Sequence, residues 1–284
     1  MRPLCLFKKD TLGGWIMEAL RLKMTDITKT FPGVKALDRV QLNVKPGSVH
    51  ALIGENGAGK STLMKCLFGL YHADEGSIEL DGKKVTIDGP TEALKQGISM
   101  IQQELTPIPY RNVIDNIWAG RFEKKGIIVD EAKMKKKTEE LLADLELNIP
   151  ATMLAKDLSV SQLQAIEIAK AVSYDARIII MDEPTSSLTN AETRHLFKII
   201  RRLKSEGRSI IYISHKLEEL FEIADEITVM RDGTYVGQYP IEDISVDELI
   251  KLMVGRSMEN RFPPNEHVVQ EDILLKVENF TSAD

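Results

Sequence analysis

The 284-residue sequence has few cysteines and no long apolar segment. Its two cysteines, Cys5 and Cys66, lie far apart in the chain and form no metal-type pair, which favours a reducing, cytosolic setting. No apolar run approaches the ~20 residues that a helix needs to cross a bilayer, so these residues cannot form a transmembrane path by themselves. The apolar patch near the N-terminus is also too short for a secretory signal sequence.

A strong excess of charge is absent as well. The formal net charge is −6, and 28% of the residues are charged. Such a balance gives no general attraction to nucleic acid or to anionic lipid. With 43% apolar residues, the chain has the composition of a globular protein and is long enough for one large domain or two small ones.

What the sequence does contain is a glycine-rich loop that matches the pattern G-x-x-x-x-G-K-[ST] at every fixed position. In such a loop the backbone N–H groups turn inward around a polyphosphate, Lys60 reaches the β and γ phosphates, and the Ser61 hydroxyl binds Mg²⁺. The apolar run 49–53 before the loop predicts a buried strand, and 62–67 after it predicts a helix whose N-terminus faces the phosphates. The loop itself is Gly54-Glu55-Asn56-Gly57-Ala58-Gly59-Lys60-Ser61.

Further elements alternate along the chain. The runs 177–181 and 209–213 are short and continuously apolar, as strands buried on both faces are, and 196–203 between them has helical periodicity. This alternation predicts a largely parallel sheet with helices on both faces. Residues from about 104 to 172 are mostly helical in pattern. Turns are expected at Phe31-Pro32-Gly33 and, within a hairpin over 227–236, at Asp232-Gly233.

Three polar segments follow predicted strands, where ligands bind in open parallel sheets. Asp182 can hold Mg²⁺ beside Ser61, and the next carboxylate, Glu183, can act as general base toward the attacking water. His215 can hydrogen-bond the γ phosphate and that water. Gln103 can reach Mg²⁺ or the water through its amide. Taken singly, a strand-end histidine or a lone glutamine carries little information, so these assignments depend on the glycine-rich loop.

Two further features point to the nucleotide. Residues 158–162 open a helix, and Ser159 with Gln162 forms the pattern of a helix capping box. A helix N-terminus with a free serine such as Ser161 also binds phosphate, if another molecule brings the phosphate. Phe31 could stack on adenine, although a phenylalanine more often belongs to a hydrophobic core.

The two ends of the chain differ from the rest. Met17 and Met24 are both possible starts, and residues 1–16 are expected to be a non-native or disordered extension of a unit over 17–258. Residues 259–284 are expected to be a polar linker and the first strand of a truncated second unit, because the sequence from Leu275 is similar to the sequence from Leu22.

Taken together, these motifs resemble the ATP-binding cassette of ABC transporters. Residues 54–61 are similar to its Walker A loop, Gln103 to its Q-loop, 158–162 to its signature, 178–183 to Walker B with the catalytic glutamate, 186–189 to its D-loop and His215 to its switch histidine. The resemblance implies a P-loop NTPase fold of the α/β class, with a mainly parallel core sheet, an antiparallel β subdomain and a helical subdomain over about 104–172. Its ligands would be ATP and Mg²⁺.

Within this family, one subgroup is especially similar to the chain. The chain resembles the first half of the tandem-cassette ATPases of monosaccharide importers, the galactose/methyl galactoside type first and the ribose type next. The similar segments are 31–37, 54–62, 103–105, 158–162 and 253–256. It implies ATP and phosphate contacts by Phe31, residues Gly54 to Thr62, Ser159, Ser161 and Gln162. It also implies membrane permease subunits and a second cassette as partners and, indirectly, an extracytoplasmic sugar-binding protein. The protein would lie at the cytoplasmic face of the membrane, and nucleic acid would not be a partner.

Two departures from the wider pattern matter. Val160-Ser161 stand where the common signature has two glycines, and Thr189 stands where the common D-loop ends in aspartate. The valine and serine of the signature restrict close backbone approach, so this signature is expected to bind phosphate less well. In the family, the loop of this cassette pairs with the signature of the second cassette, which implies one competent ATP site for each tandem chain and little turnover by the isolated chain.

The sequence leaves alternatives open. A soluble, non-transport cassette protein is the main rival, but ribosome-acting relatives usually have Asn-His-Leu-Asp where 186–189 is Ser-Ser-Leu-Thr. DNA-repair relatives usually carry zinc cysteines or coiled-coil insertions, and this sequence has neither. A GTPase would need an Asn-Lys-x-Asp motif to read its base, and none is present. A regulatory module without turnover stays open, and it would not depend on Glu183. The sugar is not identifiable from these residues.

Overall fold

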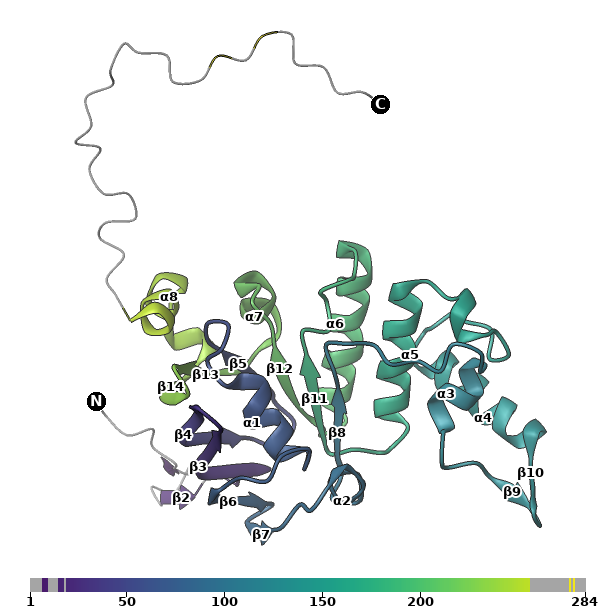
Figure 1. Cartoon of the computed structure of the whole chain (residues 1–284), viewed down its shortest axis with the longest axis horizontal. Coiled ribbons are helices and arrows are strands. Elements are labelled where there is room, and N and C mark those ends of the chain that lie inside the picture. The colour runs from purple at the N-terminus through teal and green to yellow at the C-terminus, as the bar shows by residue number, and fades with distance from the viewer. Residues whose placement is uncertain (1–6, 10–14, 18, 256–275, 277, 279–284) are drawn as a thin grey trace.

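The computed structural model describes residues 7–9, 15–17, 19–255, 276 and 278. Figure 1 draws the other residues as a thin grey trace. The expectations for residues 1–16 and 259–284 therefore lie largely outside the described residues. Within the first of these segments, β1 (Phe7–Lys9) pairs antiparallel with β2 (Trp15–Met17).

A ten-stranded sheet forms the centre of the molecule, in the order β7-β6-β3-β4-β14-β13-β5-β12-β11-β8. Its strands are β3 (Leu22–Phe31), β4 (Val34–Val44), β5 (Val49–Ile53), β6 (Glu75–Leu80), β7 (Lys83–Val85), β8 (Ile98–Ile101), β11 (Ile178–Asp182), β12 (Ser209–Ile213), β13 (Glu226–Arg231) and β14 (Thr234–Pro240). The expected α/β class is confirmed by this sheet and the helices around it.

One half of the sheet is parallel. The strands β13, β5, β12, β11 and β8 all run in the same direction. Every residue of β5, β11 and β12 is buried, which agrees with their continuously apolar sequences. The predicted strands 49–53 and 209–213 have these bounds in the structure. The third strand, predicted over 177–181, is shifted by one residue to Ile178–Asp182.

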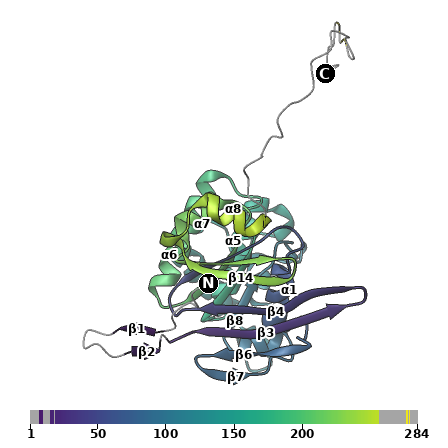
Figure 2. The same ribbon diagram turned by 90° about the vertical axis from the view of Figure 1, so that its left-hand side faces the viewer.

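The other half is mainly antiparallel. The strand β3 pairs antiparallel with both β4 and β6, and β6 pairs antiparallel with β7. The predicted turns are confirmed, because β3 and β4 are joined at Pro32-Gly33 and β13 and β14 at Asp232-Gly233. Asp232 and Gly233 both have positive φ, 48° and 73°, as a two-residue hairpin turn of the Asp-Gly type requires. Figure 2 shows β3 and β4 as long strands that extend beyond the parallel half.

Helices cover both faces of the parallel half, and the sheet separates two hydrophobic cores. Alternate strand residues point to opposite faces, so Ile179 belongs to one core and Ile180 to the other. One face is covered by α1 and α2 together with the antiparallel strands, and the other by α3, α5, α6, α7 and α8 (Figure 1). The helices are α1 (Lys60–Leu67), α2 (Pro90–Lys95), α3 (Val113–Trp118), α4 (Glu131–Asp144), α5 (Val160–Val172), α6 (Asn190–Ser205), α7 (Leu217–Ile223) and α8 (Val246–Val254).

The helices α3, α4 and α5 lie together at one end of the molecule (Figure 1). Between α3 and α4 the structure has a small antiparallel hairpin of β9 (Lys124–Lys125) and β10 (Ile128–Val129), which the sequence analysis did not anticipate. Two 3₁₀ turns complete the fold, η1 (Ala155–Asp157) and η2 (Ile241–Asp243). Within the described ranges, no helix has both the length and the apolar character that a bilayer crossing demands.

A histidine is fully buried in the strand that leads into the glycine-rich loop. The Nε2 atom of His50 lies 2.8 Å from the hydroxyl of Thr228 on β13. Burial, and secondarily Lys45, lowers the pKa of His50 from 6.5 to about 3. The ring is therefore neutral near pH 7, and the 3.8 Å between its Nδ1 atom and the Glu226 carboxylate is not an ion pair.

We predict an acid-sensitive contribution of His50 to stability. Between about pH 6.5 and pH 3 the unfolded chain binds a proton at His50 that the folded chain does not. The stabilisation is therefore complete above pH 6.5 and is lost as the pH falls. In His50→Gln, whose amide reaches toward Thr228, the loss of unfolding free energy from pH 7 to pH 5 is expected to be about 2 kcal/mol smaller than in the unmodified protein.

Urea unfolding followed by circular dichroism at the two pH values measures this difference. The matched control is His72→Gln, because His72 is exposed. Equal pH dependence in His50→Gln and in the unmodified protein would contradict the prediction.

Candidate nucleotide site

The glycine-rich loop joins β5 to α1 and is closely packed against neighbouring backbone. A Cβ atom on Gly54 would lie 2.3 Å from the carbonyl oxygen of Met230 on β13. Gly59 precedes α1 with a φ of 95°, and a Cβ there would lie 2.7 Å from the carbonyl oxygen of Ala36. Both positions therefore need glycine, because a side chain would push the loop off the sheet.

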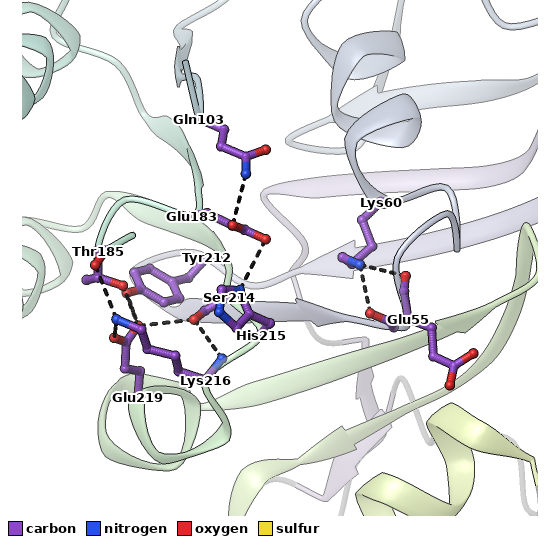
Figure 3. A network of polar contacts seen from close by, with 11 residues as sticks. Glu55, Lys60, Gln103, Glu183, Thr185, Tyr212, Ser214, His215, Lys216 and Glu219 are labelled. Atoms are coloured by element: carbon purple, nitrogen blue, oxygen red, sulfur yellow. Dashed lines mark hydrogen bonds and ion pairs between the residues drawn. The ribbon is translucent and has the colours of Figure 1, made fainter. Parts of the chain in front are cut away.

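Lys60, the first residue of α1, is held inside the curve of the loop. Its Nζ atom donates to the carbonyl oxygens of Gly54, at 2.7 Å, and Glu55, at 3.0 Å (Figure 3). Burial lowers the pKa of Lys60, and the carboxylates of Asp182 and Glu183 oppose that shift. The ammonium group is thus pre-positioned and incompletely solvated, which strengthens its attraction to an anion.

Asp182 ends β11 beside α1 and is 5% exposed. Burial raises its pKa, while a hydrogen bond from the Ser61 side chain acts in the opposite direction. The hydroxyl of Ser61 and the carboxylate of Asp182 therefore face each other, as the sequence analysis expected. Oxygen ligands of this kind suit Mg²⁺, which binds proteins through one or two carboxylates or hydroxyls and otherwise keeps water and phosphate oxygens.

Glu183, Gln103 and His215 meet although they come from three different strand ends. The Nε2 atom of Gln103 donates to one oxygen of Glu183 at 3.0 Å, and Nδ1 of His215 lies 3.3 Å from the other (Figure 3). Parallel pairing explains the meeting, because β11 lies between β8 and β12 and the carboxyl ends of all three strands share one edge.

The backbone at Glu183 turns sharply where β11 ends. Its φ is 49°, a left-handed conformation that is uncommon for a residue with a side chain and costs about 1–3 kcal/mol. Its N–H donates to the carbonyl oxygen of Ile213 on β12, at 2.9 Å. The carboxylate is therefore fixed in direction by its own backbone as well as by its two side-chain contacts.

These residues border a single cavity of about 910 Å³, a size typical of small-ligand sites. Residues 56–62, Gln103, Asp182, Glu183 and His215 all line it. The arrangement can surround a polyphosphate with backbone N–H groups and Lys60, and it places a carboxylate with a histidine and an amide on the opposite side. Phosphoryl transfer to water needs these components.

The cavity also includes residues that the sequence analysis did not assign to the site. Val34, Lys35 and Ala36 at the start of β4, and the turn Asp232-Gly233, form one of its walls. The Asp-Gly turn was recognisable as a turn, but its place beside the glycine-rich loop follows from the pairing of β14 with both β13 and β4. Such long-range pairing leaves no local signal.

Phe31 lies apart from the cavity lining. Its ring packs edge-to-face against Tyr71, with 5.2 Å between the ring centroids, and Lys29 lies over it at 5.6 Å. The exposed apolar side chain on the cavity side of this turn is Val34, which is 57% exposed. A contact of Phe31 with adenine stays a prediction.

The signature-like segment lies at the start of α5 and does not line the cavity of the glycine-rich loop. The predicted capping box is present, because the N–H of Gln162 donates to Ser159 Oγ at 3.2 Å and the N–H of Ser159 donates to Gln162 Oε1 at 3.0 Å. The hydroxyls of Ser159 and Ser161 are 3.0 Å apart. Phosphate binding by Ser159, Ser161 and Gln162 stays a prediction.

The D-loop departure has a structural role. Thr189 is the N-cap of α6, and it forms a capping box with Glu192. The N–H and the hydroxyl of Thr189 both donate to the Glu192 carboxylate at 2.8 Å. Threonine at this position therefore stabilises the start of α6.

A parallel half-sheet with a glycine-rich phosphate loop after one inner strand, and a carboxylate at the end of another strand of the same half, defines the class of P-loop nucleotide-binding proteins. Comparison with solved structures agrees. A nucleotide-free ATP-binding cassette from an ABC transporter superposes with a TM-score of 0.73 at 28% identity, covering 86% of this chain and 99% of the other. An ATP-binding cassette in its ADP conformation gives the same score and identity, covering 84% and 99%.

The family model described as ABC transporter matches residues 37–186, more than half of the chain. The chain therefore belongs to the ATP-binding cassette (ABC) transporter family.

Among curated proteins, this chain is 58% identical over 266 residues to the galactose/methyl galactoside import ATP-binding protein MglA of Clostridium tetani, covering 92% of this chain and 53% of the relative. The protein of the same name from Escherichia coli K12 is 52% identical over 261 residues, covering 92% and 51%. The chain thus spans about half the length of the curated relatives it matches.

Proposed function

We propose that this chain is an ATP-hydrolysing cassette, the first of a tandem pair, that powers import of a monosaccharide of the galactose/methyl galactoside type. The observation that carries the proposal is the meeting of Glu183, Gln103 and His215 beside Lys60 and the glycine-rich loop. The names of the similar proteins support the choice of sugar, and the ribose type is the next candidate.

In the proposed reaction a water molecule attacks the γ phosphorus of ATP, and the bond from that phosphorus to the bridging oxygen of ADP breaks. Glu183 takes a proton from the water as general base. Gln103 and His215, which both contact the Glu183 carboxylate, orient it and bound the space in which the water sits. Lys60 stabilises negative charge on the β and γ phosphates.

We also propose Mg²⁺ as the cofactor. Ser61 and Asp182 would hold it, and Gln103 would reach it through its amide oxygen. When bound, the ion neutralises phosphate charge and orients the phosphate oxygens. The raised pKa of buried Asp182 supports this assignment, because a cation at the carboxylate would remove the cost of burying its charge.

The proposed site is shared between two cassettes. The glycine-rich loop of this chain would face the signature of the second cassette, and its own segment 158–162 would face the loop of that cassette. Ser159 and Val160 are both exposed at the start of α5, as a surface that meets a second cassette requires. Closure on ATP and reopening after hydrolysis would then transmit force.

Permease subunits are the proposed receivers of that force, at the cytoplasmic face of the membrane, with a sugar-binding protein acting from the other side. We place the permease contact within residues 104–125. A groove of about 660 Å³ supports this choice, since Ile108, Ile114 and Phe122 contribute apolar surface to it beside Arg111 and Asp115. Ile108 is 48% exposed, so it is available for such a contact.

Uptake by the complete importer, with its second cassette, permease and binding protein in proteoliposomes, tests the proposal. We expect ATP-dependent uptake of labelled galactose, and competition by methyl galactoside that reduces it at least tenfold at a hundredfold excess, roughly as one shared site requires. Uptake of ribose in place of galactose would overturn the choice of sugar. Absence of ATP-dependent uptake of either sugar would overturn the transport function.

A further inference from the structure

We propose that Glu219 on α7 is a positioning residue for hydrolysis, which holds together the loop that carries Glu183 and the loop that carries His215. Neither the family resemblance nor the similar proteins assign a role to this carboxylate. The inference rests on the proposed function for its effect on turnover, but the contacts that carry it are independent of that function.

The Glu219 carboxylate receives hydrogen bonds from three side chains and forms an ion pair with a fourth. Its Oε2 atom accepts from Thr185 Oγ1 at 2.8 Å, from the Tyr212 hydroxyl at 2.8 Å and from Ser214 Oγ at 3.1 Å. Its Oε1 atom lies 3.1 Å from the ammonium group of Lys216. Figure 3 shows these side chains gathered around the carboxylate, next to the group formed by Gln103, Glu183 and His215.

The donors come from the segments on either side of the proposed catalytic groups. Thr185 follows Glu183 by two residues, whereas Ser214 and Lys216 directly flank His215. The ammonium group of Lys216 also donates to the carbonyl oxygen of Thr185, at 3.2 Å. One carboxylate thus ties two loops to each other, and the 3.3 Å contact between His215 and Glu183 depends on the relative place of those loops.

Because these groups are buried, loss of their hydrogen bonds would carry a large free-energy cost. Glu219 is 8% exposed, Ser214 is 3% and Thr185 is 2%. Burial, with Glu219 as the next cause, raises the pKa of Tyr212, so its hydroxyl stays protonated and donates. In such surroundings an acceptor that lost its charge would leave hydroxyl and ammonium donors without equivalent partners.

A helix-capping role does not account for Glu219. It occupies the third position of α7, where a glutamate often accepts from the N-cap backbone, but the N-cap residue Lys216 has no side-chain cap bond. The Lys216 N–H donates to Ser214 Oγ at 3.1 Å instead. The Glu219 carboxylate is therefore directed at side chains of the two loops.

The test compares Glu219→Gln with Glu218→Gln in the complete ATPase. Glu218 is the preceding residue of α7 and is exposed, so it is a matched control. We expect Glu219→Gln to lower kcat for ATP hydrolysis on the order of tenfold or more, because small displacements of reacting groups have effects of this size. KM for ATP and the melting temperature are expected to stay close to those of the control.

A second readout does not depend on turnover. The NMR signals of the His215 ring, assigned with His215→Ala, are expected to shift in Glu219→Gln and not in Glu218→Gln. Such a shift supports the positioning role even if the unmodified ATPase shows no Glu183-dependent turnover, a result that would overturn the proposed function alone.

Two results overturn the inference. In one, kcat and the His215 signals of Glu219→Gln match those of the control. In the other, kcat and the melting temperature fall while KM rises, which is the pattern of a merely structural residue. If Glu219→Gln does not fold, Tyr212→Phe decides in the same assays, because it removes one hydroxyl donor and keeps the ring. A lowered kcat with an unchanged KM then supports the inference, and an unchanged kcat overturns it.

Discussion

Glu183→Gln is expected to abolish ATP turnover while leaving ATP bound. The amide has the size of the carboxylate but cannot accept the proton of the attacking water. Loss of a general base of this kind costs on the order of 10²- to 10⁴-fold in rate. The phosphate-binding loop is unchanged, so ATP is expected to remain in the site and, in the proposed tandem arrangement, to hold the two cassettes together. Phosphate release and retained nucleotide, measured on the complete ATPase, check both parts.

The control for this experiment is again Glu218→Gln, which replaces an exposed carboxylate outside the cavity. Its turnover is expected to match that of the unmodified ATPase. A Glu183→Gln protein that hydrolyses ATP at the control rate would show that another group acts as base, or that turnover does not occur in this cavity.

Lys60→Ala is expected to prevent productive nucleotide binding. Two carbonyl oxygens hold Lys60 inside the loop, and burial lowers its pKa. The folded chain therefore already holds this ammonium group in position and partly out of water. Without the ammonium group, the β and γ phosphates would lose a charge-assisted bond in partly desolvated surroundings. We expect affinity for ATP to fall on the order of tenfold and turnover on the order of a hundredfold or more.

Equilibrium binding of a fluorescent ATP analogue and phosphate release measure the two effects. Lys95→Ala is the matched control, because Lys95 is an exposed lysine of α2 that does not line the cavity. Unchanged affinity and turnover in Lys60→Ala would mean that the glycine-rich loop is not the phosphate site.

Local sequence carries much of this fold. The apolar runs 49–53 and 209–213 correspond to β5 and β12, and the Asp232-Gly233 turn is where a two-residue hairpin was expected. Strand ends also predicted Asp182, Glu183 and His215, because parallel strands bring their carboxyl ends to one edge. These features depend on short segments, and short segments show their periodicity and their turn residues directly.

Other features depend on which distant segments become neighbours. Val34 and the Asp232-Gly233 turn line the cavity through the pairing of β14 with β4, and Phe31 packs against Tyr71 through the position of the chain after α1. Glu219 has no motif of its own, since its role comes from hydroxyls that lie up to 34 residues away in sequence. Neither the spacing of residues nor a resemblance of motifs contains such information.

The most direct test places the unmodified ATPase, Lys60→Ala and Glu183→Gln side by side and measures retained ATP and released phosphate in each. We predict that the unmodified ATPase releases phosphate and that Glu183→Gln retains ATP without releasing phosphate. We predict that Lys60→Ala neither retains ATP nor releases phosphate. Phosphate release by Glu183→Gln at the rate of the unmodified ATPase would contradict the assignment of this cavity as the site of ATP hydrolysis.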